Sequence, residues 1–288
     1  MILTHEATIR LGAFLSVLTI MGVWELVAPR RELTARKTPR WATHLGLVAL
    51  NTFMARLVLP VTAVTAAATA EGAGWGALRQ VAWPDWVEIA LALVALDLII
   101  YASHVLFHRV PLLWRLHRVH HADLDLDVTS GVRFHTLEIL ASALLKVAAV
   151  VALGASPTAV VLFEVLLNAT ALFNHSNVRL AAPLDRCLRC VLVTPDMHRV
   201  HHSVRREETN SNYGFNIPWW DYLFRTYHAQ PADGHQGMTI GLAEFRDERQ
   251  VERLDGILLL PISLPRDVPG ERCDAAGASR HDRGHLGS

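Results

Sequence analysis

The chain has 288 residues, 51% of them hydrophobic, and its equal numbers of basic and acidic side chains give a formal net charge of zero. This balance excludes a chain-wide attraction to nucleic acid or to an acidic partner. Three cysteines are too few for a disulfide framework, so we interpret the CxxC pair Cys187 and Cys190 as reduced helical side chains. Apolar residues come in long runs and mean hydropathy is +0.25, which is typical of membrane proteins.

Five apolar segments are predicted as membrane helices, with either four or all five of them crossing. They cover residues 11–28, 42–69, 87–107, 137–155 and 158–174. The second is long and contains Arg56, which predicts a tilt, a break or a course along the interface. "GASP" at 154–157 is a turn signal and predicts a helical hairpin from the last two. The first segment lacks a signal-peptide cleavage pattern, so we expect a retained anchor.

Basic residues between the first two segments predict the orientation. The stretch 29–41 holds five Lys or Arg against one acidic residue, so it is predicted to lie in the cytoplasm. Alternation then places 70–86 outside and puts both 104–136 and the chain after 174 on the cytoplasmic side. Residues from about 265 onward are rich in Gly, Pro, Arg and Asp, a composition that predicts no fixed fold.

Ten of the sixteen histidines lie between residues 104 and 202, and the pentapeptide HRVHH occurs twice. These ten are His104, His108, His117, His120, His121, His135, His175, His198, His201 and His202. Spacings of three and four place imidazoles on one face of a helix. A single ion needs three or four such ligands, so nine or ten imidazoles predict two metal ions. His135 and His175 stand alone in the sequence and are the weaker candidates.

An all-nitrogen ligand shell suits both iron and zinc. The H-E-x-x-H pattern of hydrolytic zinc enzymes is missing. Asp97 lies on the same helical stripe as His104 and His108, inside a predicted span, where an acidic group needs a partner. We expect its carboxylate to accept a hydrogen bond from a ligating imidazole, with bridging between neighbouring helices as the alternative.

The histidine groups H-x3-H, H-x2-HH and H-x2-HH, together with the residues around them, resemble the fatty acid hydroxylase/sterol desaturase superfamily of integral-membrane di-iron enzymes. The matching blocks are "HRVPLLWRLHRVHHADLDLDVTSGVRFHTLE" (108–138), "FNHSNVRL" (173–180), "TPDMHRVHHS" (194–203) and "NYGFNIPWWDYLFRTY" (212–227). The resemblance covers residues 90–228. Thr136 and Arg225 depart from it, standing where the family often has proline and glycine, and put the local turn geometry in question.

The resemblance implies an all-α fold, an integral-membrane helical bundle with a cytosolic helical cap that carries a histidine-rich di-metal site. It implies two iron ions, with O2 as co-substrate, held by nine of the ten histidines, and it makes His135 either a ligand or a neighbour of the ligands. Asp97, Glu138, Asp196 and Asp221 are candidates for orienting imidazoles, and Asn212 and Tyr213 for shaping the cap near the site. The expected domains are N-terminal membrane helices (1–86), a catalytic core (87–228) and a partly unstructured C-terminal extension (229–288).

The expected function is O2-dependent hydroxylation or desaturation of a lipid such as a fatty acyl chain or a sterol-like lipid. No flavin, haem-attachment or iron–sulfur signature is visible, so electrons are expected from a separate ferredoxin- or cytochrome-type donor with its reductase. The alternative is a membrane metal-binding or metal-transport protein without oxygenase activity, although transport sites tend to lie near the bilayer midplane. A protein that binds haem through two histidines would need single facing histidines rather than triplets.

Overall fold

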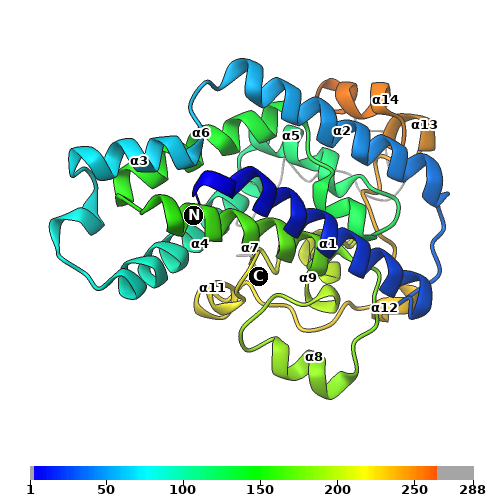
Figure 1. The fold of residues 1–288 in the computed structure, drawn as a ribbon. Coiled ribbons are helices and arrows are strands. Elements are labelled where there is room, and N and C mark those ends of the chain that lie inside the picture. The colour runs from blue at the N-terminus through cyan, green and yellow to red at the C-terminus, as the bar shows by residue number, and fades with distance from the viewer. Residues whose placement is uncertain (1–2, 265–288) are drawn as a thin grey trace, which may run out of the picture.

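Long helices form the frame of the molecule in the computed structural model, which describes residues 3–264 (Figure 1). The segment from residue 265 onward, for which the sequence predicts no fixed fold, lies outside the described residues. The frame consists of the long helices α1 (Glu6–Val27), α2 (Lys37–Val58), α4 (Asp85–Arg109), α6 (Thr136–Leu153) and α7 (Pro157–His175), together with the shorter α3 (Ala63–Ala73). Between residues 3 and 264 there are isolated β-bridges but no strand, which confirms the all-α prediction.

Short helices form a cap on this frame. They are α5 (Pro111–His121), α8 (Ala182–Leu188), α9 (Pro195–His201), α10 (Arg206–Thr209), α11 (Trp219–Leu223), α12 (Gly234–Gly237), α13 (Glu248–Val251) and α14 (Leu254–Leu259). Single 3-10 turns cover Leu3–His5, Ala77–Gln80, Val128–Val132 and Leu260–Ile262. Figure 1 shows α12, α13 and α14 near the end of the frame at which α1 ends and α2 begins.

Five helical segments are long and apolar enough to cross a membrane, which is compatible with an integral membrane protein. They are Glu6–Val27, Lys37–Gln80, Asp85–Arg109, Thr136–Leu153 and Pro157–His175. The second contains the break that its length allowed, because α2 ends at Val58 and α3 begins at Ala63. Pro60 has no N–H to continue the helix, and the Thr62 side chain caps α3 by accepting a hydrogen bond from the Thr65 N–H.

The end of the frame farthest from the cap is held by small side chains and one close turn. Ala67 of α3 packs with Ala92 of α4 and Ala149 of α6, and such residues let membrane helices approach closely. Gly154 ends α6 in the left-handed conformation, with φ 69°, and Ser156 then caps α7. The two helices therefore form the predicted hairpin.

A buried network of charges fastens α2 to the cap. The Arg40 guanidinium donates to both carboxylate oxygens of Asp123 at 2.9 Å, and to Asp127 at 2.7 Å. Arg133, also fully buried, donates to the carbonyl oxygens of Val119 and Val251. Burial would raise the pKa of Asp123, but Arg40 and Arg133 outweigh it and hold that pKa well below its usual range.

Replacing Arg40 by alanine should destabilise the protein by about 3–5 kcal/mol, because two buried carboxylates would lose their cation. The matched control is Arg36→Ala, one turn earlier and exposed, which should change the stability little. Thermal unfolding in detergent measures both variants. Equal melting temperatures for the Arg40 variant and the wild type would show that the network does not hold the cap.

Candidate metal centre

Nine of the ten predicted histidines converge in two clusters. The five-histidine cluster contains His104, His108, His117, His121 and His201, and the four-histidine cluster contains His120, His175, His198 and His202. In each cluster, one ring nitrogen from every member lies within 4.8 Å of those of all the others. The clusters draw on α4, α5, α7 and α9, so residues almost a hundred positions apart meet at one end of the frame.

The repeated pentapeptide divides its histidines between the two clusters. His117 and His121 of α5, four residues apart, enter the five-histidine cluster, whereas His120 enters the other. In the second copy, His198 and His202 enter the four-histidine cluster and His201 crosses to the first. Each HRVHH therefore bridges both clusters and fixes their separation.

Hydrogen bonds at Nδ1 set the direction of the rings. His104 donates to the Tyr213 carbonyl at 2.8 Å, His175 to the Ala171 carbonyl at 2.7 Å, and His201 to the Ser211 carbonyl at 2.6 Å. A carbonyl oxygen can only accept, so each Nδ1 carries the proton and each Nε2 keeps a lone pair.

These lone pairs face one another at short range. Nε2 of His104 lies 3.1 Å from that of His117 and 3.0 Å from that of His201. Within the described residues, the buried Nε2 atoms of His108 and His121 have no hydrogen-bond partner. Two nitrogens bound at right angles to one ion, each about 2.0–2.1 Å from it, would lie about 3.0 Å apart. The five-histidine cluster therefore fits a cation.

The four-histidine cluster has the same spacing. Nε2 of His175 lies 3.0 Å from that of His120 and 3.1 Å from that of His198, and the Nε2 atoms of His198 and His202 are 3.3 Å apart. Because the proton of His175 is engaged at Nδ1 by a carbonyl, its Nε2 presents a lone pair to both neighbours. A second cation fits here for the same reason.

The clustered imidazoles that lie outside the five candidate membrane segments are held in the neutral form. Burial and the neighbouring imidazoles lower the pKa of His120, His121, His198 and His202 well below the ordinary value of 6.5. Burial also lowers the pKa of His201, to about 3. Neutral imidazole is the form that binds metal, so these rings need lose no proton to become ligands.

Of the four acidic residues predicted to orient imidazoles, Glu138 of α6 contacts one of the nine clustered histidines. Its Oε1 lies 2.6 Å from Nδ1 of His117. A carboxylate in this position fixes the tautomer of a ligand and raises its basicity.

His135, for which the resemblance implied either a ligand or a neighbour of the ligands, lies outside both histidine clusters. Its Nδ1 accepts a hydrogen bond from the Leu137 N–H at 3.2 Å, and its Nε2 lies 3.3 Å from the Leu258 carbonyl oxygen. His135 immediately precedes α6 in an extended conformation, so its ring caps the helix rather than joining either cluster.

The expected contact between Asp97 and an imidazole is also absent. The Asp97 carboxylate accepts hydrogen bonds from the Asn216 amide and the Trp220 indole, both at 2.7 Å. It therefore bridges α4 to the segment around α11, the alternative that the sequence left open.

Asp196 and Asp221 do not orient clustered imidazoles either. Asp196 forms ion pairs with Arg30 and Arg199. These pairs connect helix α9 to the loop that follows α1. Asp221 accepts hydrogen bonds from the main-chain N–H groups of Tyr213 and Gly214. It therefore holds the loop whose Tyr213 carbonyl accepts the hydrogen bond from His104.

The turn after α10 is built by side chains that bond to the main chain. Asn212 has a positive φ of 49°, and its amide donates to the carbonyls of Met197 and His228. Arg225 has φ 58°, in the left-handed region that glycine adopts most easily. The departure from glycine at this position therefore leaves the turn intact, at some cost in backbone strain.

Several residues around the site gave no signal in the sequence. The carbonyl oxygens of Ala171, Ser211 and Tyr213 act through the main chain, so residue type carries no information about them. A third group of possible ligands, His44, Asp123 and Glu252, had a partial signal in the acidic run "ADLDLD". Arg40 and Arg133 already supply the positive charge to this group, so we interpret it as part of the ion-pair network.

Comparisons with known proteins agree with the geometry. Residues 89–226 match the family model described as fatty acid hydroxylase. Ornithine lipid hydroxylase OlsE of Rhizobium tropici is 36% identical over 151 residues, which cover 52% of this chain and 44% of that protein. Alkylglycerol monooxygenase of Homo sapiens is 28% identical over 152 residues, covering 51% and 32%.

A cholesterol 25-hydroxylase-like protein of Danio rerio is 28% identical over 154 residues, covering 53% of this chain and 58% of that protein. The chain thus spans less than half the length of the first two relatives. The comparison with solved structures gives no match.

Replacing Glu138 by glutamine should weaken metal binding roughly 10- to 100-fold, because the carboxylate that orients His117 is lost. His135→Gln is the matched control and should bind metal as tightly as the wild type. Competition against a chelator of known affinity measures both. Unchanged affinity in the Glu138 variant would contradict the orienting role, and lost affinity in the His135 variant would restore His135 as a ligand.

The metal-free protein should lose stability as the pH falls from about 7 to about 5, because the unfolded chain then binds protons on these imidazoles and the folded protein does not. Burial raises the pKa of Glu252 to about 7 and that of Asp221 to about 6, and these groups act in the opposite direction. The five imidazoles with lowered pKa values outnumber them. Melting temperatures of metal-free protein across this range measure the effect, and a higher melting temperature in acid would refute it.

Proposed function

We propose that this protein is a membrane-bound, O2-dependent di-iron oxidoreductase that hydroxylates a lipid, because residues 89–226 match the fatty acid hydroxylase model. The observation that carries the proposal is the pair of histidine clusters, in which one ring nitrogen from each member converges with the others, in groups of five and four. Zinc has no redox chemistry, whereas iron does, so the hydroxylase relationship favours iron. The nine clustered histidines would hold the two ions.

The proposed reaction inserts one oxygen atom into a C–H bond. O2 takes two electrons from the substrate carbon and two from an external donor, with two protons, and yields an alcohol and one water molecule. Two iron ions, when bound, supply the reduction of O2 and the attack on an unactivated C–H bond. The external reductant is a ferredoxin- or cytochrome-type protein with its own reductase.

The protein's own side chains position the ligands and keep the site dry. Phe134 stacks on His120 with ring centroids 4.4 Å apart, and Trp114 lies 5.0 Å from His108. Tyr213 covers His108 from another side at 5.1 Å. Enclosure by these rings excludes water, which protects a reactive site from side reactions.

A lipid substrate is supported by the relatives and by the position of the site. The names of the matched proteins refer to an ornithine lipid, to alkylglycerol and to cholesterol 25-hydroxylase. The clusters lie where α4 and α7 end, at His104, His108 and His175, so the site sits at the edge of the apolar segments. The run of basic residues at 29–41 favours the cytoplasmic edge.

Hydroxylation is favoured over desaturation because the matched relatives are hydroxylases and monooxygenases. A metal transporter is disfavoured, because transport sites occur near the bilayer midplane on interrupted helices. The clusters here lie at helix ends, and α4 and α7 run without a break into them.

The proposed catalytic core, residues 87–228, is completed by part of the C-terminal extension. The Arg118 guanidinium of α5 donates to the carbonyls of Leu260 and Ser263, at 2.6 and 2.7 Å. We therefore assign residues 229–264 to the cap rather than to a separate unit.

Purified protein should contain two irons per chain and show no Soret band, and cells that express it should accumulate a lipid carrying one additional oxygen atom. Metal analysis, an optical spectrum and lipid mass spectrometry measure these three properties. Cells expressing a His175→Gln variant are the control and should lack the oxidised lipid. One zinc per chain, or a haem spectrum, would reject the proposal, and a lipid lacking two hydrogen atoms would identify a desaturase.

A further inference from the structure

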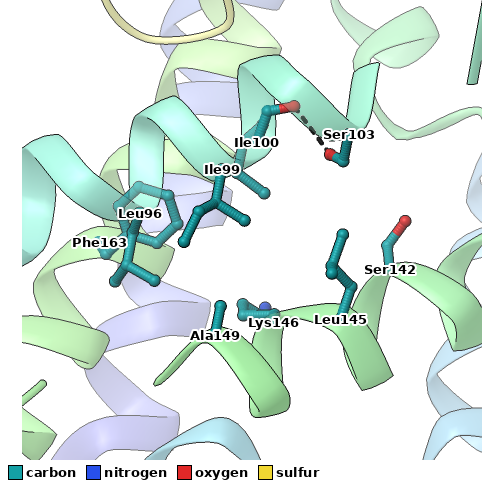
Figure 2. Close-up of a pocket in the computed structure, with 9 residues that line it drawn as sticks. All are labelled: Leu96, Ile99, Ile100, Ser103, Ser142, Leu145, Lys146, Ala149 and Phe163. Carbon is teal, nitrogen blue, oxygen red and sulfur yellow. Dashed lines mark hydrogen bonds between the residues drawn. The ribbon is translucent and has the colours of Figure 1, made fainter. Parts of the chain in front are cut away.

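A cleft opens at the end of the frame farthest from the cap, between the loop that follows α3 and the first turns of α4 (Figure 1). Its volume is about 390 Å³, which lies in the range of small-molecule binding sites. The middle of the frame is packed much more tightly. The space between α4 and α6, lined by Ile99 and Leu145, measures about 10 Å³ and has room for about one water molecule (Figure 2). Of these two spaces, the cleft is therefore the one that can hold a ligand.

The cleft is separate from the metal centre. Asp85, which begins α4, lines the cleft, and His104 lies on the same helix. A helical rise of about 1.5 Å per residue puts His104 roughly 29 Å further along the axis. The sequence also predicts that the loop at 70–86 and the histidines lie on opposite sides of the membrane. A small group bound in the cleft therefore makes no contact with the clustered imidazoles.

The floor of the cleft is fixed by contacts between three segments of the chain. Arg79 Nε donates to the Gly154 carbonyl, in the turn between α6 and α7, at 2.7 Å. Gly76 approaches that turn so closely that an added Cβ would lie 2.1 Å from the Gly154 nitrogen. Glu88 of α4 accepts hydrogen bonds from the Ser156 N–H and hydroxyl, at 2.8 and 2.7 Å. A ligand would therefore find the cleft already formed, and its binding would order little of the chain.

Negative charge is in excess among the side chains that line the cleft. Arg79 is the one cation among them, and it pairs with Glu71 at 3.1 Å and with Glu88 at 3.4 Å. The third acidic residue, Asp85, has no hydrogen bond or ion pair within residues 3–264. Three carboxylates against one guanidinium leave two negative charges in excess. Such a cleft attracts a cation.

The spacing of the carboxylates favours an organic cation over a metal ion. Oxygen ligands 2.3–2.6 Å from one calcium ion lie at most about 5 Å apart. In the described part of the chain, Glu71, Asp85 and Glu88 do not form a group whose ligand atoms all lie within 4.8 Å of one another, as the histidine clusters do. The indole of Trp83 and the side chain of Ile89 also line the cleft. An indole ring attracts an ammonium group by a cation–π interaction, and apolar walls suit the carbons attached to it.

We propose that this cleft binds an organic ammonium group, carried by a lipid head group or by a soluble amine. Asp85 and Glu71 would bind the positive charge, and Trp83 would cover the carbons next to the nitrogen. Trp75, Trp83 and Trp86 are all exposed at this end of the frame, and tryptophan is enriched where a membrane meets water. Both sources of ammonium occur there. The inference concerns a site remote from the histidines and does not depend on the proposed function.

The test measures binding of amines to the full-length protein in detergent. Native mass spectrometry should show more bound phosphatidylethanolamine than phosphatidic acid with the same acyl chains if the source is a lipid. Calorimetric titration should show binding of free ethanolamine if the source is a soluble amine. Either result supports the inference and identifies the source.

Asp85→Asn and Trp83→Leu should each weaken amine binding roughly 3- to 10-fold, because one removes an unpaired charge and the other the indole ring. The matched controls are Glu32→Gln, an exposed acidic residue before α2, and Trp86→Leu, an exposed indole outside the cleft lining. Both controls should bind the amine as tightly as the wild type.

The inference is overturned if the wild type binds neither amine, or if phosphatidic acid binds as tightly as phosphatidylethanolamine and free ethanolamine does not bind. Unchanged affinity in either the Asp85 or the Trp83 variant would also overturn it. The selectivity of the wild type decides the question even if a variant does not fold. Metal-free protein should bind the amine as tightly as iron-loaded protein, so a failure of the proposed function would leave this site standing.

Discussion

The rest of the structure depends on the direction in which the imidazole protons point. When the Nδ1–H of a buried histidine ring donates a hydrogen bond to a main-chain carbonyl, the lone pair of Nε2 must point to the opposite side of the ring. His104, His175 and His201 all have this arrangement, with partners in two segments, the loop at 211–213 and helix α7. The carbonyls therefore have to be rigid, since a main chain that moved would turn the ring with it.

The main chain around the site is accordingly held in place by several side-chain hydrogen bonds. Asn212 joins the first turn of α9 to the segment after α11, and Asp221 accepts hydrogen bonds from the two N–H groups that follow Asn212. On the other side, Arg133 bonds through its side chain to Val119, while its own carbonyl oxygen lies 3.3 Å from Nδ1 of His120. The arginine that neutralises buried aspartate thus also touches the four-histidine cluster. Charge burial and ring orientation are coupled through this one residue.

Sequence spacing was sufficient to find eight of the nine clustered histidines, because intervals of three and four constrain imidazoles to one face of a helix. His175 stands alone in the sequence and was expected as a ligand only from the family resemblance. Spacing left two alternatives open for Asp97 and none of its own for His135, because the neighbours of both residues come from elsewhere in the chain. His135 precedes a helix and caps it, and Asp97 meets Trp220 and Asn216 more than a hundred residues away. Periodicity states which face a residue occupies but not what covers that face.

Long-range ion pairs were equally invisible in the sequence. Arg40 appears there as one of several basic residues that mark a cytoplasmic loop, yet its side chain is fully buried against Asp123. The break between α2 and α3 was one of the outcomes that the length of the segment 42–69 allowed, and Pro60 lies inside that segment. Local chemistry could be predicted, whereas the pairing of distant charges required coordinates.

The contribution of α9 and the C-terminal segment has a consequence for biosynthesis. His198, His201 and His202 contribute to both clusters. Arg118 donates a hydrogen bond to the carbonyl of Ser263, much later in the chain. A nascent chain that has released only its membrane helices from the ribosome exposes half-formed groups of histidines, with neither cluster complete. Neither cluster can therefore bind its ion with a full set of ligands before α9 has been synthesised, and chains truncated before α9 would leave the ribosome without a complete cluster for either ion.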